Sequence, residues 1–176
     1  HKGQVMISFA AAVPTWLIES VLCKPVPVVR VIPNTPSLIG QGMNPYCLGK
    51  HVPENAVAVI QEFLGLFGSS IRIDECLMNA ATALTAVGPT YVLPVISALA
   101  SAAEAKGITH GDALSMAAQT VAGAARLVCE TGRDPAELKM MITTRTLDEE
   151  TASSLFTDAF NDAFARVLRS EGKVTR

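Results

Sequence analysis

A turn bounded by two prolines carries side chains that could contact a ligand. Asn34 and Thr35 stand between Pro33 and Pro36, directly after an apolar run. The two prolines remove backbone donors and fix φ, so strand pairing should stop there while the amide and hydroxyl groups stay available. Ligands of open α/β sheets bind at the carboxyl ends of strands. The turn is therefore a candidate ligand contact, although an ordinary exit from a strand fits the local pattern equally well.

Two further polar segments are candidates from their local chemistry. Asp74 and Glu75 follow an expected strand; Asp74 would suit a helix N-cap, and a solvated helix start explains both residues. In the functional interpretation Glu75 faces a ligand instead. The segment Thr143-Thr-Arg-Thr146 combines three hydroxyl groups with a guanidinium, which together suit a carboxylate or a phosphate. It would serve equally well as a polar turn between helices.

The sequence lacks the motifs of several other catalytic and metal-binding sites. There is no Ser-His-Asp order, no pair of catalytic carboxylates and no phosphate-binding glycine loop, and Gly40-x-Gly42 lacks the third glycine of a dinucleotide fingerprint. The four cysteines and three histidines are scattered without the spacing of metal ligands. We therefore expect no metal site, and we expect reduced thiols in a cytoplasmic protein.

Composition and charge restrict the class of protein. The 176 residues are 49% hydrophobic and 17% charged, which favours a folded chain with a sizeable core. A formal charge of −2 argues against nucleic acid as a partner. No uninterrupted apolar run reaches the roughly 18 residues that a bilayer requires, so no membrane partner is expected.

The first part of the chain has the pattern of an α/β domain. Val28, Val29, Val31 and Ile32 form a nearly continuous β-branched run, which predicts a strand covered on both faces. The pattern predicts strands over 5–9, 26–32, 45–48 and 70–73, and helices over 15–22 and 53–67. This alternation indicates βαβ units and a parallel sheet.

The chain looks wholly helical from Glu75 onward. Helices are predicted over 75–87, 89–106, 110–131, 135–142 and 149–170. Thr109 and Asp134 have the spacing of N-caps, Gly107 and Gly132 suit the left-handed position after a helix, and Pro94 should kink the second helix. We therefore predict two domains, 1–74 and 75–176.

Small residues crowd the two longest central helices of this second part. Alanines dominate residues 98–105 and 117–125, and both helices are apolar on more than one face. Few elements of a single chain remain to cover such faces, so we expect a homodimer through the helical part. A compact helical core within one chain is the alternative.

The order of several motifs resembles that of the pyrroline-5-carboxylate reductase family. The motifs are Arg30-Val-Ile-Pro-Asn-Thr-Pro36, Leu84-Thr-Ala-Val-Gly-Pro-Thr-Tyr91, Ala117-Ala-Gln-Thr-Val-Ala-Gly-Ala-Ala125, Glu130-Thr-Gly132 and Pro135-Ala-Glu-Leu-Lys139. They occur in the family's order with near-family spacing, and the resemblance covers essentially the whole chain.

The resemblance implies a fold and an activity. It implies the later part of a dinucleotide-binding, Rossmann-like α/β domain, followed by an all-α domain that interlocks into a homodimer and could assemble further. It implies that the full-length protein reduces the imine pyrroline-5-carboxylate to L-proline with NADP or NAD as the cofactor. Glu75 matches an acidic residue of the family near the substrate. The implied cofactor contacts are Ser8, Phe9, Ala10, Ala11, Pro33 and Asn34.

The sequence also departs from the family pattern. The family's N-terminal glycine-rich βα unit is not seen, so we expect this chain alone to bind NADPH poorly and to be inactive. The family's substrate loop, Ser-Pro-Gly-Gly-Thr-Thr, falls at about 143–148, which contain no glycine. Here Thr144 and Thr146 are the candidate catalytic hydroxyl donors and Arg145 the candidate carboxylate ligand. There are two alternatives to reduction of pyrroline-5-carboxylate. The full-length protein could reduce a different imine, or it could be a non-catalytic relative that acts as a dimerisation or binding module.

Overall fold

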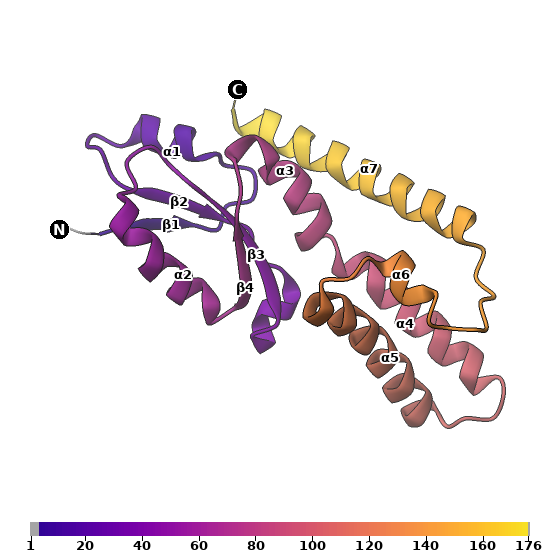
Figure 1. Ribbon diagram of the computed structural model, residues 1–176. Coiled ribbons are helices and arrows are strands. Elements are labelled where there is room, and N and C mark those ends of the chain that lie inside the picture. The colour runs from indigo at the N-terminus through magenta and orange to yellow at the C-terminus, as the bar shows by residue number, and fades with distance from the viewer. Residues whose placement is uncertain (1–3, 176) are drawn as a thin grey trace. The chain divides into compact units, whose positions relative to one another are not determined.

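The computed structural model describes residues 4–175, which form two compact units. Within the described residues, the first unit comprises 4–89 together with 157–175, and the second comprises 90–156. These units divide the chain differently from the predicted domains, and the division at residue 74 stays a prediction. Figure 1 shows the helices and strands of both units, and each unit is described by itself.

A four-stranded mixed sheet forms the centre of the first unit. Its strands, in spatial order, are β1 (Met6–Ser8), β2 (Val28–Val31), β3 (Gly42–Leu48) and β4 (Gly68–Arg72). The pairs β1–β2 and β3–β4 are parallel, whereas β2–β3 is antiparallel. The predicted all-parallel sheet is therefore wrong. Only residues 32–41 join β2 to β3, and a parallel connection needs a crossover of about a dozen residues or more.

The turn between β2 and β3 also differs from its prediction. Residues Thr35–Ile39 form a 3-10 helix, and Gly40 ends it in the left-handed conformation at φ 68°. β3 then begins at Gly42, earlier than the predicted Pro45. Gly42 pairs in register with Gly68, whose φ is +124°, and a Cβ on Gly68 would lie 2.3 Å from the Gly42 carbonyl oxygen. The two strands approach here as only glycine permits.

The two faces of the sheet carry different cores. Val29 and Val31 pack with Ile60 and Leu64 of α2 (Val57–Gly65), together with Tyr46 of β3. On the opposite face, the buried cluster consists of Ile32, Cys47 and Met78. Every residue of β2 is buried, which confirms the prediction of a strand covered on both faces.

The remaining helix of the first part and the start of the helical part lie near their predicted positions. α1 runs Thr15–Val21. The predicted helix over 75–87 is divided into a 3-10 turn (Glu75–Leu77), α3 (Met78–Ala81) and a π-helical turn (Thr82–Ala86). Asp74 occupies the N-cap position of the 3-10 turn, as predicted, but its side chain makes no cap hydrogen bond.

The later helices follow the predicted cap residues. They are α4 (Pro89–Glu104), α5 (His110–Thr131), α6 (Pro135–Lys139) and α7 (Glu149–Val174). Thr109 accepts a hydrogen bond from Asp112 N, Asp134 accepts one from Ala136 N, and Gly132 ends α5 with φ 63°. These three boundary predictions are confirmed. Pro94 lies inside α4, as expected.

Little apolar surface is buried where α4 meets α5. The buried cluster consists of Ala100, Ala113 and Ala117, with Ile96 and Ala103 partly buried beside it. Leu93, Leu99, Leu114 and Met116 of the same two helices are exposed. Alanine side chains bury little area, so this unit leaves most of its larger apolar side chains in contact with solvent.

One helical stretch of the described residues, Glu75–Glu104, is long and apolar enough to cross a membrane when only length and composition are considered. The sequence itself contains no uninterrupted apolar run of that length. The two criteria differ because the helix includes polar residues such as Asn79 and Thr82. These residues interrupt an apolar run, but the mean hydropathy of the helix stays high. A helix that packs through more than one face has the same composition, so this property alone is weak evidence for a membrane.

Candidate functional site

A buried arginine lies at the centre of the polar network of the first unit. Arg30 is the third residue of β2, pairs in register with Cys47 of β3, and its side chain is 1% exposed. Removing a guanidinium from water costs several kcal/mol unless charged partners and hydrogen bonds compensate for it. The structure supplies such partners from three separate segments.

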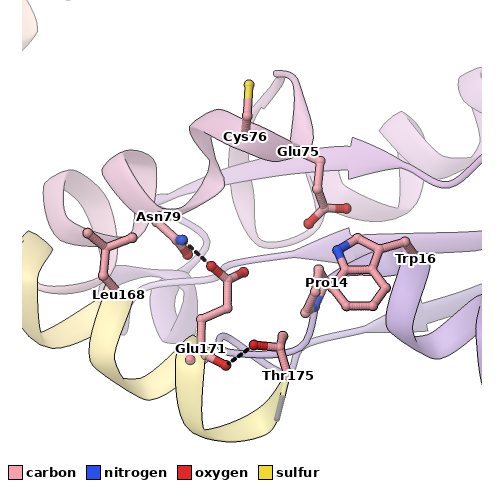
Figure 2. Close-up of a pocket in the computed structure, with 9 residues that line it drawn as sticks. Pro14, Trp16, Glu75, Cys76, Asn79, Leu168, Glu171 and Thr175 are labelled. Atoms are coloured by element: carbon pink, nitrogen blue, oxygen red, sulfur yellow. Dashed lines mark hydrogen bonds between the residues drawn. The ribbon is translucent and has the colours of Figure 1, made fainter.

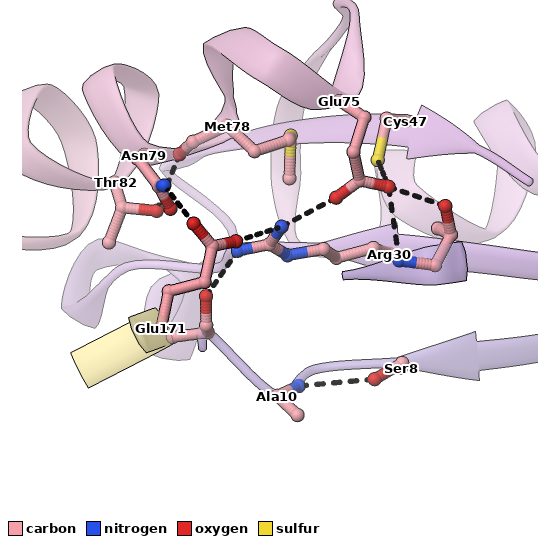
Figure 3. A network of polar contacts seen from close by, with 11 residues as sticks. Ser8, Ala10, Arg30, Cys47, Glu75, Met78, Asn79, Thr82 and Glu171 are labelled. Carbon is pink, nitrogen blue, oxygen red and sulfur yellow. Dashed lines mark hydrogen bonds and ion pairs between the residues drawn. The ribbon is translucent and has the colours of Figure 1, made fainter. Parts of the chain in front are cut away.

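The guanidinium of Arg30 joins these segments directly (Figure 3). Nη1 donates to Glu75 Oε1 at 2.5 Å and lies 3.7 Å from Glu171 Oε1. Nη2 donates to the carbonyl oxygen of Ala11, in the loop that follows β1. Arg30 therefore connects that loop, the start of the helical part and the last turns of α7.

Glu75 is turned into this network. Its Oε1 accepts from Arg30, and its Oε2 accepts from Thr15 N at 3.0 Å, from Thr15 Oγ1 and from Cys47 Sγ at 3.3 Å. The side chain is 28% exposed. A solvated helix start, which local chemistry allowed for this residue, is therefore wrong for Glu75.

Burial and hydrogen bonding act in opposite directions on Glu75. Burial alone would raise its pKa, but the hydrogen bonds from Thr15 and Arg30, with a further one from Cys47, outweigh burial and hold the pKa below its usual value. Burial, followed by the nearby Glu75 carboxylate, raises the pKa of Cys47 to about 12. Cys47 is thus a neutral thiol that donates to Glu75, and it is not an activated nucleophile.

We expect Glu75 to make the protein more sensitive to acid. A group whose pKa is lower in the folded state contributes stability above its unfolded pKa, and loses it as the pH falls through the folded value. The melting temperature should therefore fall below about pH 4.3, the ordinary value of glutamate. Thermal melts across this range should show a shallower acid dependence for Glu75→Gln, while the exposed Glu137→Gln should retain the original slope. Equal slopes for both variants would contradict the assignment.

The predicted cofactor contacts lie at two neighbouring strand ends. Ser8 ends β1, and Phe9, Ala10 and Ala11 follow it as exposed residues. Ser8 Oγ accepts from Ala10 N at 3.3 Å. Pro33 follows β2, and because β1 and β2 are parallel, their carboxyl ends meet at one edge of the sheet. Their contact with a cofactor stays a prediction.

Asn34 uses both ends of its amide within the protein. Its Nδ2 donates to the Thr85 carbonyl oxygen at 3.1 Å, and its Oδ1 accepts from Met43 N at 3.2 Å. These bonds fix the exit of β2 against the start of β3 and against the π-helical turn. Asn34 therefore shapes the loop that carries two of the predicted cofactor contacts, Pro33 and Asn34 itself.

The predicted catalytic and substrate-binding residues of the segment 143–146 belong to the second unit. Thr144, Arg145 and Thr146 are exposed in the loop between α6 and α7. Arg145 Nη1 lies 3.0 Å from Met140 Sδ. The guanidinium remains open to solvent, and the roles of all three residues stay predictions.

Sequence reasoning missed the residues that bond to Glu75, which are Arg30, Thr15 and Cys47. It also missed Glu171, which lies near Arg30, and Asn79, which donates to Glu171. One signal was available: a lone charge inside a strand covered on both faces needs a buried counter-charge. That signal identifies Arg30 but not its partners, which come from distant parts of the chain.

The helical part of the chain matches a family model. The model describes pyrroline-5-carboxylate reductase dimerisation, and it matches residues 75–171. Among the described residues no group of three or more histidine, cysteine or acidic side chains could hold a metal ion.

Curated relatives and solved structures agree with this match. The chain is 39% identical over 141 residues to pyrroline-5-carboxylate reductase of Methanosarcina acetivorans, covering 80% of this chain and 52% of the relative. It is 38% identical over 115 residues to that of Arabidopsis thaliana, covering 65% and 42%. The chain therefore spans about half the length of the curated relatives it matches.

Two solved structures illustrate the likeness in fold. The Coxiella burnetii pyrroline-5-carboxylate reductase has a TM-score of 0.84 at 30% identity, covering 94% of this chain and 65% of that one. The Plasmodium falciparum pyrroline carboxylate reductase, solved with NADP bound, also has a TM-score of 0.84, at 22% identity, covering 96% and 71%.

Proposed function

The chain belongs to the pyrroline-5-carboxylate reductase family, and from this we propose that the whole protein reduces pyrroline-5-carboxylate to L-proline with NADPH or NADH. The observation that carries the proposal is the family match, which covers more than half of the chain. The fold agrees with it, since a Rossmann-like α/β part precedes a helical part in this chain as in its relatives.

The sheet edge fits a nicotinamide group. The exposed loop after β1 and the turn after β2 lie at the carboxyl ends of parallel strands, where dinucleotides bind in α/β folds. The small side chains of Ala10 and Ala11 leave room for a flat ring. The cofactor, when bound, supplies the hydride. The residues of this chain then have the tasks of orienting the imine and excluding water.

Two residues, Arg30 of the buried network and Asn34 of the turn after β2, would shape this edge without touching the substrate. Arg30 holds the Ala11 carbonyl, and Asn34 fixes the exit of β2. In the proposal, Arg145 pairs with the carboxylate of the imine, and Thr144 and Thr146 donate hydrogen bonds near the developing amine. No histidine or cysteine is required for such chemistry.

The exposed apolar side chains of the helical part support a homodimer. Leu93 and Leu99 of α4 and Leu114 and Met116 of α5 are all exposed in the single chain. A second copy of this segment would cover them, as the name of the matching family model suggests. A cytoplasmic location is part of the same proposal and agrees with four free cysteines.

Turnover of the whole protein tests the proposed function. Incubation with pyrroline-5-carboxylate and NADPH should consume NADPH and yield L-proline in equal amounts. Arg145→Ala should raise the KM for the imine about tenfold, the loss expected for one charge-assisted hydrogen bond. Arg133→Ala, an exposed arginine that pairs with Glu137, serves as the matched control and should leave the KM unchanged.

The absence of glycine from residues 143–148 favours a second candidate, a non-catalytic member of the family that acts as a dimerisation module. Glycines allow backbone amides to close around a ligand, and these residues instead carry side chains. No turnover with pyrroline-5-carboxylate or another cyclic imine, from a protein that is dimeric by light scattering, would select this candidate. An unchanged KM in Arg145→Ala, with turnover intact, would instead remove only the role of Arg145.

A further inference from the structure

A cavity of about 560 Å³ lies within the first unit, and its lining includes Glu75 and Glu171, the two carboxylates near Arg30 (Figure 2). It is lined by the start of α1, by the residues around the beginning of α3 and by the last turns of α7. Its volume falls within the range of small-molecule sites, roughly 300–1,000 Å³. The proposed reduction uses neither this cavity nor most of the side chains that line it.

The walls of the cavity differ in chemistry. Trp16, Pro14 and Leu168 provide apolar surface, and Trp16 is 53% exposed although it lies beside a largely buried network. Asn79 and Glu171 provide oxygen atoms, and Figure 2 shows them joined to each other. An occupant therefore needs one polar end and one apolar end.

The polar wall has acceptors that the protein does not fully use. Asn79 is 8% exposed, and its Nδ2 donates to Glu171 Oε2 at 2.5 Å. Its Oδ1 is buried and has no hydrogen-bond partner among the described residues. Glu171 Oε1 has Arg30 Nη1 at 3.7 Å, beyond hydrogen-bond distance. A buried acceptor without a donor costs about 1–3 kcal/mol of folding free energy. A ligand that donates a hydrogen bond to this oxygen would remove that cost.

The charges at this wall favour a cation. Arg30 contributes one positive charge, and Glu75 and Glu171 contribute two negative charges. Glu75 is already engaged at both oxygens. The remaining negative charge is therefore that of Glu171, which faces the cavity next to the free Asn79 oxygen.

We propose that this cavity binds the ammonium group of a small organic amine. The ammonium has three donors and no acceptor, so it can serve both Asn79 Oδ1 and Glu171 Oε1 while neutralising the excess charge. The indole of Trp16 can cover the apolar body of the amine or face its charge. A carboxylate would be repelled by Glu171, and an alcohol would leave the charge unbalanced. The proposed reduction does not require an occupant here, although Glu75, which the resemblance places near the substrate, also lines the cavity.

The chain contains a single tryptophan, so its fluorescence reports on the cavity. Titration with n-butylammonium chloride should produce a saturable change in emission and a rise in melting temperature. n-Butanol and sodium butyrate, which have the same chain length without the positive charge, should produce neither. A saturable response to n-butanol equal to that of the ammonium, or no saturable response to the ammonium, would overturn the proposal.

Substitution of Glu171 tests the polar wall. Glu171→Gln should weaken n-butylammonium binding about tenfold, as expected for the loss of one charge-assisted hydrogen bond. Glu62→Gln changes the net charge equally on the exposed surface of α2 and should leave the affinity unchanged. Equal affinities of the two variants would contradict the proposal. If Glu171→Gln does not fold, the comparison of the three probes on the unmodified protein decides alone.

Discussion

Arg30→Met is expected to lower the free energy of unfolding by about 3 kcal/mol, the lower end of the range for breaking a buried ion pair. Methionine fills most of the volume but leaves Glu75 without its positively charged partner and the Ala11 carbonyl without a donor. The lower end applies because Glu75 and Glu171 are 28% and 23% exposed, so water can reach part of each carboxylate. Urea denaturation followed by circular dichroism measures the change.

A matched arginine on the same sheet provides the control. Arg72 in β4 is 51% exposed and lies 4.0 Å from the exposed Glu54, so Arg72→Met should change stability by no more than about 0.5 kcal/mol. The double variant Arg30→Met with Glu75→Leu should recover part of the loss, because the Glu75 carboxylate no longer stays in the network without its arginine. Recovery should be incomplete, because Glu171 still lacks the contact with Arg30. Equal effects of Arg30→Met and Arg72→Met would show that the buried network contributes nothing.

Gly68→Ala is expected to lower the free energy of unfolding by about 3 kcal/mol or more, through backbone strain combined with a steric clash. Gly68 has φ +124°, and the added Cβ would lie 2.3 Å from Gly42 O and 2.4 Å from Gly42 N. Both atoms belong to the backbone of β3, so no side chain can move aside. The two strands must separate at their first pair, which Gly42 and Gly68 form.

A glycine of the same unit tests whether the clash is the cause. Gly65 ends α2, and nothing lies within 4 Å of a Cβ placed there. Gly65→Ala should therefore be neutral or stabilise the protein by up to about 1 kcal/mol, because alanine restricts the unfolded chain. The comparison uses urea melts of both variants. A loss at Gly65 as large as that at Gly68 would contradict the explanation.

Local rules predicted much of the fold from the sequence. Two predicted N-caps, Thr109 and Asp134, begin α5 and α6, and their side chains accept the expected hydrogen bonds. Gly132 ends α5 in the left-handed conformation that glycine adopts readily. The β-branched run of β2 likewise indicated a fully buried strand. These features depend on residues close together in the chain, which is why the sequence alone was sufficient.

Strand direction and the details of the polar network depend on distant contacts instead. The antiparallel pairing of β2 with β3 follows from the short connection over residues 32–41. The sequence pattern predicts a longer loop there, because it places the start of β3 at Pro45 and does not indicate the 3-10 helix Thr35–Ile39. Glu75 was selected as a candidate, but its partner Arg30 was hidden by the apolar residues on either side. Burial of a charge is decided by which partners the fold brings to it, and no local pattern contains that information.

The guanidinium of Arg30 also has a consequence for the order in which the protein folds. During synthesis Glu75 becomes available long before Glu171, so β1, β2 and β3 can assemble with Arg30 paired to one carboxylate only. The last turns of α7 then add the contact with Glu171, across most of the length of the chain. Contacts of such high sequence separation raise the contact order and slow folding. The final step of folding should therefore be the docking of α7 onto a sheet that is already formed.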